Sequence, residues 1–262
     1  MTHWTIYQAG LIAMVYLALA GWVLSLARDK VSHASSIWVL SISMAAFCYV
    51  LFFYELHTRT LVVLTLVSIW AIRLSIYLAT RDFAKKEDFR YAAIRKSQEP
   101  FFWLTSLLTI FGLHAMCAWL ISMPLFFAIE NNAPLNFFDY FGATLVIFGI
   151  TVESVADAQL AKFKQKTQQQ NIVMQQGLWR LCRHPNYVGE CFVWWGFYCI
   201  ALAVNAWWSV ISPILIILLL FKWHGIPHIE KRMLTHYSGY RNYMQSTPAF
   251  LPNIFKKLPP LS

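Results

Sequence analysis

Seven long apolar stretches divide this sequence, and they constrain its fold more than any other feature. A bilayer core of about 30 Å needs roughly 20 apolar residues in a helix. Stretches of about that length lie near residues 5–27, 36–56, 60–79, 102–129, 137–155, 188–204 and 206–222. Only 13% of the residues are charged, against about 25% in an ordinary soluble domain. The sequence therefore predicts an all-α integral membrane bundle of about seven transmembrane helices.

Lysines and arginines are distributed unevenly between the predicted loops. If the N-terminus lies outside, the cytoplasmic loops carry 19 of the 21 lysines and arginines. Cytoplasmic loops of membrane proteins are enriched in these cations, so the distribution predicts an outside N-terminus and a cytoplasmic C-terminus. The same bias accounts for the net charge of +9, which therefore does not indicate a nucleic-acid partner.

The predicted cytoplasmic loops are also the long ones. Residues 80–101, 156–187 and 223–262 hold nearly all of the polar material, whereas most outer connections span a handful of residues. We therefore expect chemistry with water-soluble partners on the cytoplasmic side of a single transmembrane domain, 1–262. Residues 204–206 allow either a tight turn or one long bent span.

Ionisable side chains inside predicted spans are costly, and they are often functional. Glu55 lies at the outer end of the second span, where it is either an interfacial carboxylate or a functional acid. Glu153 and Asp157 are four residues apart at the end of the fifth span, and Asn186 and Glu190 repeat that spacing at the start of the sixth. Residues four apart share one helical face. These side chains either form hydrogen bonds and ion pairs with neighbouring helices or line a pocket.

The stretch RLCRHPNYVGECFVWW, residues 180–195, places a polar cluster at the start of an apolar helix. Pro185 suits the first turn of that helix. Exposed backbone N–H groups and the helix dipole favour an anion there. The pattern predicts a site for an anionic ligand, and an aromatic and basic interfacial belt is the alternative. The candidate residues are Arg180, Arg183, His184, Asn186, Tyr187 and Glu190.

The C-terminal segment carries aromatic and charged residues that can close a cap over the same cytoplasmic side: Lys222, Glu230, Tyr237, Tyr240 and Arg241. His224 and His228 are four apart, but Gly225 and Pro227 interrupt a helix between them. Because the helix is interrupted and no cysteine lies nearby, we predict no metal site there.

Three stretches resemble the steroid 5-alpha-reductase family, most closely its uncharacterised and mostly bacterial branch. They are GITVESVADAQLAKFKQK (149–166), GLWRLCRHPNYVGECFVWWG (177–196) and GIPHIEKRMLTHYSGYRNYMQSTPAFLP (225–252). The resemblance covers roughly residues 140–255. A similar R-H-P-x-Y-x-G-E core occurs in the isoprenylcysteine carboxyl methyltransferases and related phospholipid methyltransferases, which use S-adenosylmethionine.

The resemblance implies a membrane enzyme that binds NADPH among its later helices and cytoplasmic loops. Its reaction is hydride transfer to a carbon–carbon double bond conjugated to a carbonyl. Residues 1–130 are the expected substrate side, and residues 137–262 are the expected cofactor side. The resemblance assigns cofactor contacts to Asp157, Lys164, Asn186, Glu190, Lys222, Glu153, Tyr77 and Arg81. The argument for an anion site adds Arg180, Arg183, His184 and Tyr187, and the cap adds Glu230, Tyr237 and Arg241.

This sequence departs from the family at the catalytic end. The resemblance gives Glu55, in FYELH, the role of the acid that polarises the substrate carbonyl. Trp70 occupies the place where the family carries a tyrosine. An indole N–H can donate a hydrogen bond but does not deliver a proton as a phenol does. Tyr54 and Tyr77 are the candidate replacements.

Three hypotheses follow for the function. The first is an NADPH-dependent reductase of a hydrophobic, lipid-like or steroid-like enone. The second is an S-adenosylmethionine-dependent membrane methyltransferase, and the third is a non-enzymatic membrane lipid-binding protein. For the first we expect membrane lipids and a lipid-like substrate as partners, with no obligate protein partner. The expected location is a bacterial inner membrane, or the endoplasmic reticulum in a eukaryote.

Overall fold

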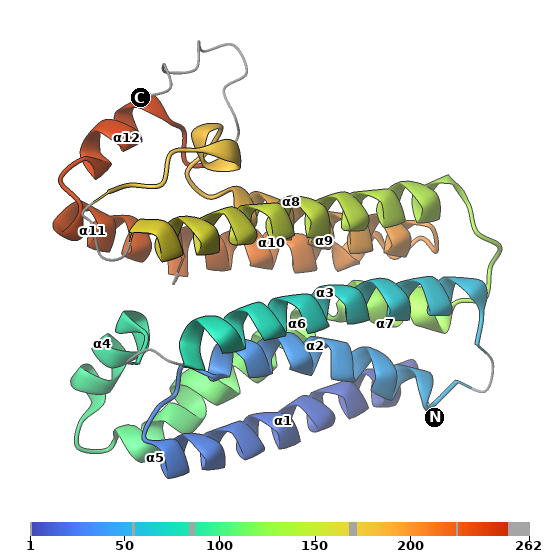
Figure 1. Ribbon diagram of the computed structural model, residues 1–262. Helices are drawn as coiled ribbons and strands as arrows, with labels where there is room; N and C mark the ends of the chain where they lie inside the picture. Colours follow the sequence, from blue (N-terminus) through green and yellow to red (C-terminus); the bar gives the residue numbers. More distant parts are fainter. Residues whose placement is uncertain (1, 54–55, 84–86, 168–171, 224, 251–262) are drawn as a thin grey trace. The chain divides into compact units, whose positions relative to one another are not determined.

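The computed structural model describes residues 2–53, 56–83, 87–167, 172–223 and 225–250. Every regular element in that part of the chain is a helix, which confirms the all-α prediction (Figure 1). The chain folds as two units. Unit 1 comprises Met1–Ala143 and Gly196–Leu215, and unit 2 comprises Thr144–Trp195 and Ile216–Ser262.

Helices coincide with all seven predicted apolar stretches. Five stretches form α1 (His3–Arg28), α2 (Ala34–Val50), α3 (Thr58–Phe83), α8 (Phe137–Thr167) and α9 (Pro185–Leu202). The fourth stretch is divided into α5 (Phe102–Ser106), the π-helix η1 (Leu107–Gly112), α6 (Leu113–Ile121) and α7 (Met123–Glu130). The last is divided into the 3-10 helix η3 (Trp207–Val210), α10 (Ile211–Leu218) and the π-helix η4 (Leu219–Trp223).

Five helical segments of the described chain are long and apolar enough to cross a membrane. They are His3–Arg28, Thr58–Asp82, Phe102–Ile121, Phe137–Lys166 and Trp207–His236. Helix α2 is apolar but has only 17 residues, and α9, which carries Glu190, is not among the five. The membrane-type fold is therefore confirmed, whereas the number seven and the orientation stay predictions.

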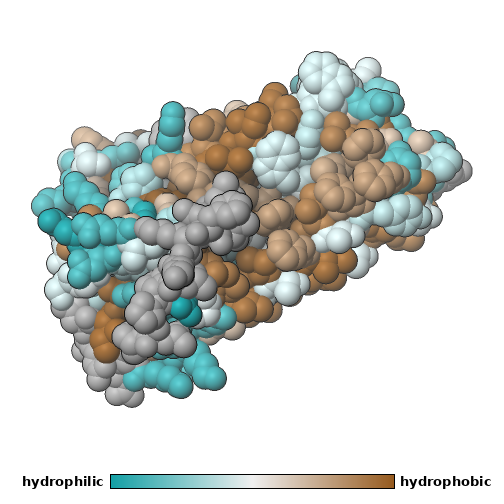
Figure 2. Space-filling view, turned by 90° about the horizontal axis from the view of Figure 1, so that it is seen from above, coloured by the Kyte–Doolittle hydropathy of each residue, from teal (hydrophilic) through white to brown (hydrophobic). Residues whose placement is uncertain are grey.

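In unit 1, α2 is the central helix and packs against α1, α3, α6 and α7. Its inward side chains Val39, Ile42 and Tyr49 are completely buried. Large apolar side chains on other faces, such as Ile76 and Leu108, are more than half exposed. Figure 2 shows hydrophobic residues over the middle of one face and hydrophilic residues towards both of its ends. Apolar outer faces of this kind suit contact with lipid.

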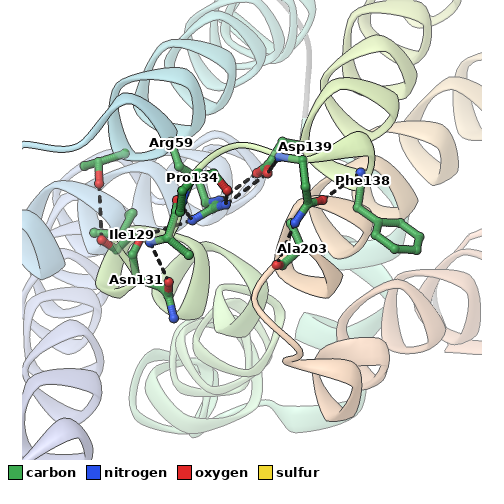
Figure 3. A network of polar contacts seen from close by, with 10 residues as sticks. Arg59, Ile129, Asn131, Pro134, Phe138, Asp139 and Ala203 are labelled. Carbon is green, nitrogen blue, oxygen red and sulfur yellow. Dashed lines mark hydrogen bonds and ion pairs between the residues drawn. The ribbon is translucent and has the colours of Figure 1, made fainter.

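A buried ion pair fixes one end of unit 1. The Arg59 guanidinium donates to both Asp139 carboxylate oxygens, at 2.6 and 2.9 Å. It also donates to the carbonyls of Asn131, Ala133 and Pro134, at 3.0 to 3.1 Å (Figure 3). Arg59 is 1% exposed and Asp139 is 4% exposed. The arginine therefore ties the start of α3 to the connection that leads into α8.

Residues 204–206 form a tight turn between α9 and η3, rather than one long bent span. Asn205 adopts a left-handed conformation with φ 62°, which asparagine tolerates better than most residues. The backbone N–H of Ala206 donates to the carbonyl of Ala201 at 3.1 Å and closes the turn. Asn136, which precedes α8, donates its side-chain amide to the carbonyl of Ala203 at 2.9 Å.

In unit 2, α8 and α9 approach closely at two glycines. A Cβ added to Gly189 would lie 2.7 Å from the carbonyl oxygen of Gly149 and 2.7 Å from the backbone nitrogen of Glu153. Small residues at helix interfaces in membranes permit such backbone contact. The 3-10 helix η2 (Gly177–Arg180) and the C-terminal helices α11 (Ile226–His236) and α12 (Tyr240–Ser246) complete this unit.

Candidate functional site

Three buried carboxylates face the α8–α9 contact of unit 2. Glu153 and Asp157 on α8 are each 4% exposed, and Glu190 on α9 is 6% exposed. The close approach at Gly149 and Gly189 brings the two helices together at this level. Burying ionisable groups is costly unless hydrogen bonds or charges compensate. The predicted i, i+4 pairs therefore do meet at one helix interface.

Asn186 joins the two pairs. Its side-chain amide donates to Oδ1 of Asp157 over 3.5 Å, which is at the long limit for a hydrogen bond. Its own carbonyl oxygen, Oδ1, is buried and accepts no hydrogen bond from the described residues. An amide oxygen can accept two hydrogen bonds. Asn186 therefore presents an acceptor that suits a ligand donor.

Glu190 is oriented by a residue that the sequence argument missed. The indole N–H of Trp194 donates to Oε1 of Glu190 at 2.9 Å, and the indole is completely buried. The spacing of four residues along α9 is a signal that was present in the sequence. Trp194 holds the carboxylate in one position within unit 2.

Arg183 is engaged within the protein. Its Nε donates to Oε1 of Glu230 at 2.7 Å. Its Nη1 donates to the carbonyls of Met244 and Thr247, at 3.0 and 2.5 Å. The side chain is 9% exposed. Arg183 thus pairs with Glu230, and direct contact between Arg183 and a cofactor stays a prediction.

His184 shares the same carboxylate. Its Nε2 lies 3.0 Å from Oε1 of Glu230, and the residue is 4% exposed. The imidazole stacks on the ring of Tyr187, with 5.6 Å between centroids and 13° between planes. Because a carboxylate only accepts hydrogen bonds, the contact assigns the Nε2 proton to His184. Glu230 thereby holds both residues that precede α9.

The C-terminal segment docks on η2 and on the residues that follow it. The hydroxyl of Tyr243 donates to the carbonyl of Trp179, and the backbone N–H of Arg183 donates to the carbonyl of Pro248 at 2.9 Å. Burial raises the pKa of the Tyr243 hydroxyl well above its usual range. The segment therefore covers residues 179–184, as the sequence predicts for a cap, although cover over a bound ligand stays a prediction.

Two hydrogen bonds join η2 to α8 and position the residues that the C-terminal segment covers. The indole N–H of Trp179 donates to the carbonyl of Ala156 at 3.0 Å, and the backbone N–H of Leu178 donates to Oε1 of Gln159 at 2.9 Å. Cys182 lies beside these contacts and is 3% exposed. Burial raises the pKa of its thiol to about 11, although a hydrogen bond from the His184 backbone acts in the opposite direction.

The remaining predicted cofactor residues of unit 2 lie at its surface. Lys164, Lys222 and Arg241 are exposed, whereas Arg180 and Tyr237 are half-buried. Cations at this position can pair with phosphate oxygens. The unit thus carries buried acceptors on α8 and α9, and it carries cations at more accessible positions.

The predicted catalytic residues are less completely described. Tyr54 and Glu55 lie outside the described residues. Tyr77 is half-buried on α3 of unit 1. Arg81 donates to both carboxylate oxygens of Asp82, at 2.8 and 3.0 Å. Trp70, at the place of the family's tyrosine, is completely buried in unit 1.

The arrangement in unit 2 suits a ligand that is rich in hydroxyl and amide donors and also carries phosphates. Donors would meet the acceptors of Asp157, Asn186 and Glu190, and phosphates would meet the exposed cations. The buried carboxylates would repel phosphates. The phosphates of such a ligand would therefore lie at the exposed cations, away from the acceptors on α8 and α9. Among the described residues, no group of three or more histidine, cysteine, aspartate or glutamate side chains could hold a metal ion.

Comparison with known proteins places the chain in a sequence family. Residues 21–247 match a family described as "Protein of unknown function (DUF1295)". The chain is also 21% identical to a protein of Schizosaccharomyces pombe titled "Uncharacterized protein C594.04c", over 95% of this chain and 80% of the relative. No solved structure matches the chain.

Proposed function

This chain belongs to the DUF1295 family of proteins of unknown function, and from that premise we propose that it is a membrane-embedded, NADPH-dependent reductase. The proposed substrate is a hydrophobic lipid-like or steroid-like molecule with a carbon–carbon double bond conjugated to a carbonyl. The proposal draws on the steroid 5-alpha-reductase resemblance of residues 140–255 and on the site in unit 2. The proposed location is a bacterial inner membrane.

The cluster of Asp157, Asn186 and Glu190 is the observation that carries the proposal. The two carboxylates are buried, and the Asn186 carbonyl oxygen accepts no bond from the described residues. Ribose hydroxyls and the nicotinamide carboxamide are donors that match such acceptors. A purely structural cluster would leave no reason to bury an acceptor that the described residues do not satisfy.

Cations suit the phosphates of the same cofactor. Lys164, Lys222 and Arg241 are exposed in unit 2, and NADPH carries several negative charges that need such partners. S-adenosylmethionine carries no phosphate and a single carboxylate, so it would engage few of these cations. This charge argument favours the reductase over the methyltransferase.

The chain's own residues prepare the reaction by binding and orienting. NADPH, when bound, supplies a hydride to the β carbon of the conjugated double bond, and a proton completes the reduction at the α carbon. Asn186 and Glu190 hold the cofactor, with Trp194 fixing the Glu190 carboxylate. Glu55 is the proposed acid at the substrate carbonyl, with Tyr54 or Tyr77 in place of the phenol that Trp70 does not provide.

The proposal is tested by incubating detergent-purified protein with deuterated NADPH and a panel of enone lipids. We expect a product that is heavier by one deuterium at the β carbon, and we expect that Glu55→Gln abolishes its formation. If the protein instead transfers a methyl group from S-adenosylmethionine to a lipid, the reductase assignment is wrong. A protein that binds lipid but neither cofactor would belong to the non-enzymatic alternative.

A further inference from the structure

One arginine joins the C-terminal segment to the start of α9. Arg183 directly precedes His184 and α9, yet its guanidinium reaches Glu230 on α11 and the carbonyls of Met244 and Thr247. Its backbone N–H also donates to the carbonyl of Pro248. A single residue therefore contacts both ends of the segment 226–250.

The segment begins directly after Gly225, the N-cap of α11. Gly225 follows the π-helix η4, and a Cβ at this position would overlap the carbonyl oxygen of Leu220. Only glycine fits there without displacing the Leu220 backbone, and α11 begins at the next residue. Single-turn π-helices are frequent at functional sites. The segment 226–250 thus follows a position that only glycine fits, and Arg183 holds it both on α11 and near its C-terminal end.

The same contacts bear on the residues proposed to bind the cofactor. Glu230 accepts from Arg183 and also from His184, which immediately precedes Pro185 and Asn186. His184 in turn stacks on Tyr187 in the first turn of α9. Fixing Glu230 therefore fixes the first turn of the helix that carries Asn186 and Glu190.

We propose that Arg183 and Glu230 form a latch that positions the cofactor site, rather than contacting the cofactor phosphates. This inference rests on the proposed function. The latch docks the segment 226–250 onto residues 179–184 and holds the first turn of α9 ready for the cofactor. Arg183 and Glu230 are positioning residues, because they act through His184 and Asn186.

Burial supports the latch over direct phosphate binding. Arg183 is 9% exposed, and the Glu230 side chain is 12% exposed. Two of the three guanidinium nitrogens already bond to the protein. A phosphate that took the place of the Glu230 carboxylate would break a partly desolvated pair, which is strongly unfavourable, and only Nη2 is left for any other contact.

The test uses the full chain in detergent and three variants. Glu230→Gln keeps the shape of the side chain and removes its charge. Arg183→Lys keeps the charge and removes the planar fork that spans three acceptors. Lys231→Gln is the matched control, because Lys231 is the exposed neighbour of Glu230 on α11. Hydrogen exchange at residues 240–248 and the dissociation constant for NADPH are measured for each protein.

We expect both latch variants to exchange residues 240–248 at least about tenfold faster and to bind NADPH at least about tenfold more weakly. The control should change either quantity by less than about twofold. Saturating NADPH should also slow exchange at residues 240–248 in the unmodified protein, because coupling between two sites is reciprocal. A merely structural contact would show no such protection.

Each other outcome overturns a stated part of the inference. Unchanged exchange in both variants would show that Arg183 and Glu230 do not hold the segment. Faster exchange with an unchanged NADPH affinity would show that the segment does not position the cofactor site. If the unmodified protein binds no NADPH, the proposed function fails and the link to a cofactor fails with it, whereas the exchange measurement still decides whether the latch exists.

Discussion

Arg59 and Arg183 show how this chain keeps a guanidinium buried. Each makes several hydrogen bonds, Arg59 to Asp139 and three carbonyls, and Arg183 to Glu230 and two carbonyls. A buried arginine is tolerated only when its donors are satisfied and its charge is paired. In both cases the charge ties together segments that are distant in the sequence.

Replacing Asp139 by asparagine should destabilise unit 1 strongly. The change leaves the Arg59 charge buried without its anion, and removing one partner of a buried pair costs about 3 kcal/mol or more. We expect a clearly lower midpoint of thermal unfolding for Asp139→Asn in detergent. Asn132→Ala, in the exposed connection before α8, is the control and should change stability by less than about 0.5 kcal/mol. Equal midpoints for all three proteins would refute a stabilising pair.

Cys182 should resist alkylation at neutral pH. Its thiol is buried, and a pKa of about 11 leaves only a very small fraction as the reactive thiolate. Labelling of its peptide by a maleimide, followed by mass spectrometry, should be slow at pH 7 and rise about tenfold per pH unit up to pH 9. Rapid and pH-independent labelling would show that the segment 226–250 does not cover this thiol.

At the scale of elements, the contact between α8 and α9 builds the candidate site. Glycines at 149 and 189 let the two backbones touch, and the carboxylates of Glu153, Asp157 and Glu190 are buried at the same contact. Helix geometry alone places residues four apart on one face, which is why these pairs were predictable from the sequence.

Other parts of the site were not predictable from local patterns. Glu230 lies 47 residues from Arg183 along the chain, and no helical period links them. The sequence therefore predicted an anion site at Arg183, whereas the structure gives the arginine a protein partner. The division of the fourth apolar stretch into α5, η1, α6 and α7 likewise depends on packing and on Pro124, which can begin a helix but not continue one.

Substituting Gly189 should separate α8 from α9. An alanine Cβ would press on the backbones of Gly149 and Glu153, and overpacking of this kind costs about 1–3 kcal/mol. We expect Gly189→Ala to lower the unfolding midpoint and to weaken NADPH binding. The control is Gly239→Ala, because a Cβ there would meet only a Val173 methyl at 4.0 Å. If Gly189→Ala and Gly239→Ala have the same unfolding midpoint and the same affinity for NADPH, the close approach of α8 and α9 is not needed for the site.

At the scale of the whole molecule, composition alone established the membrane class. Hydrophobic residues make up 58% of the chain, and five helical segments are long and apolar enough to span a bilayer. The distribution of cations predicts an orientation, because loops rich in lysine and arginine tend to remain in the cytoplasm. If this predicted orientation holds, the proposed cofactor must come from the cytoplasm.

The topology can be measured with cysteines introduced into the chain and a reagent that does not cross the membrane. We expect Asn132→Cys to be labelled from outside intact cells and Gln245→Cys to be labelled only after the membrane is opened. Both residues are exposed in the structure, so a difference in labelling between them reports the side of the membrane and not burial within the fold. Labelling in the reverse order would place the candidate site of unit 2 outside the cytoplasm and away from NADPH.

A binding titration tests the central claim most directly. Detergent-purified protein is titrated in parallel with NADPH, NADH and S-adenosylmethionine, and the titrations are repeated with Asn186→Ala, Glu190→Ala and the Gly239→Ala control. We predict saturable NADPH binding that both site variants weaken at least about tenfold and that the control leaves unchanged. Saturable binding of S-adenosylmethionine without NADPH, or NADPH binding indifferent to both site variants, would contradict the account.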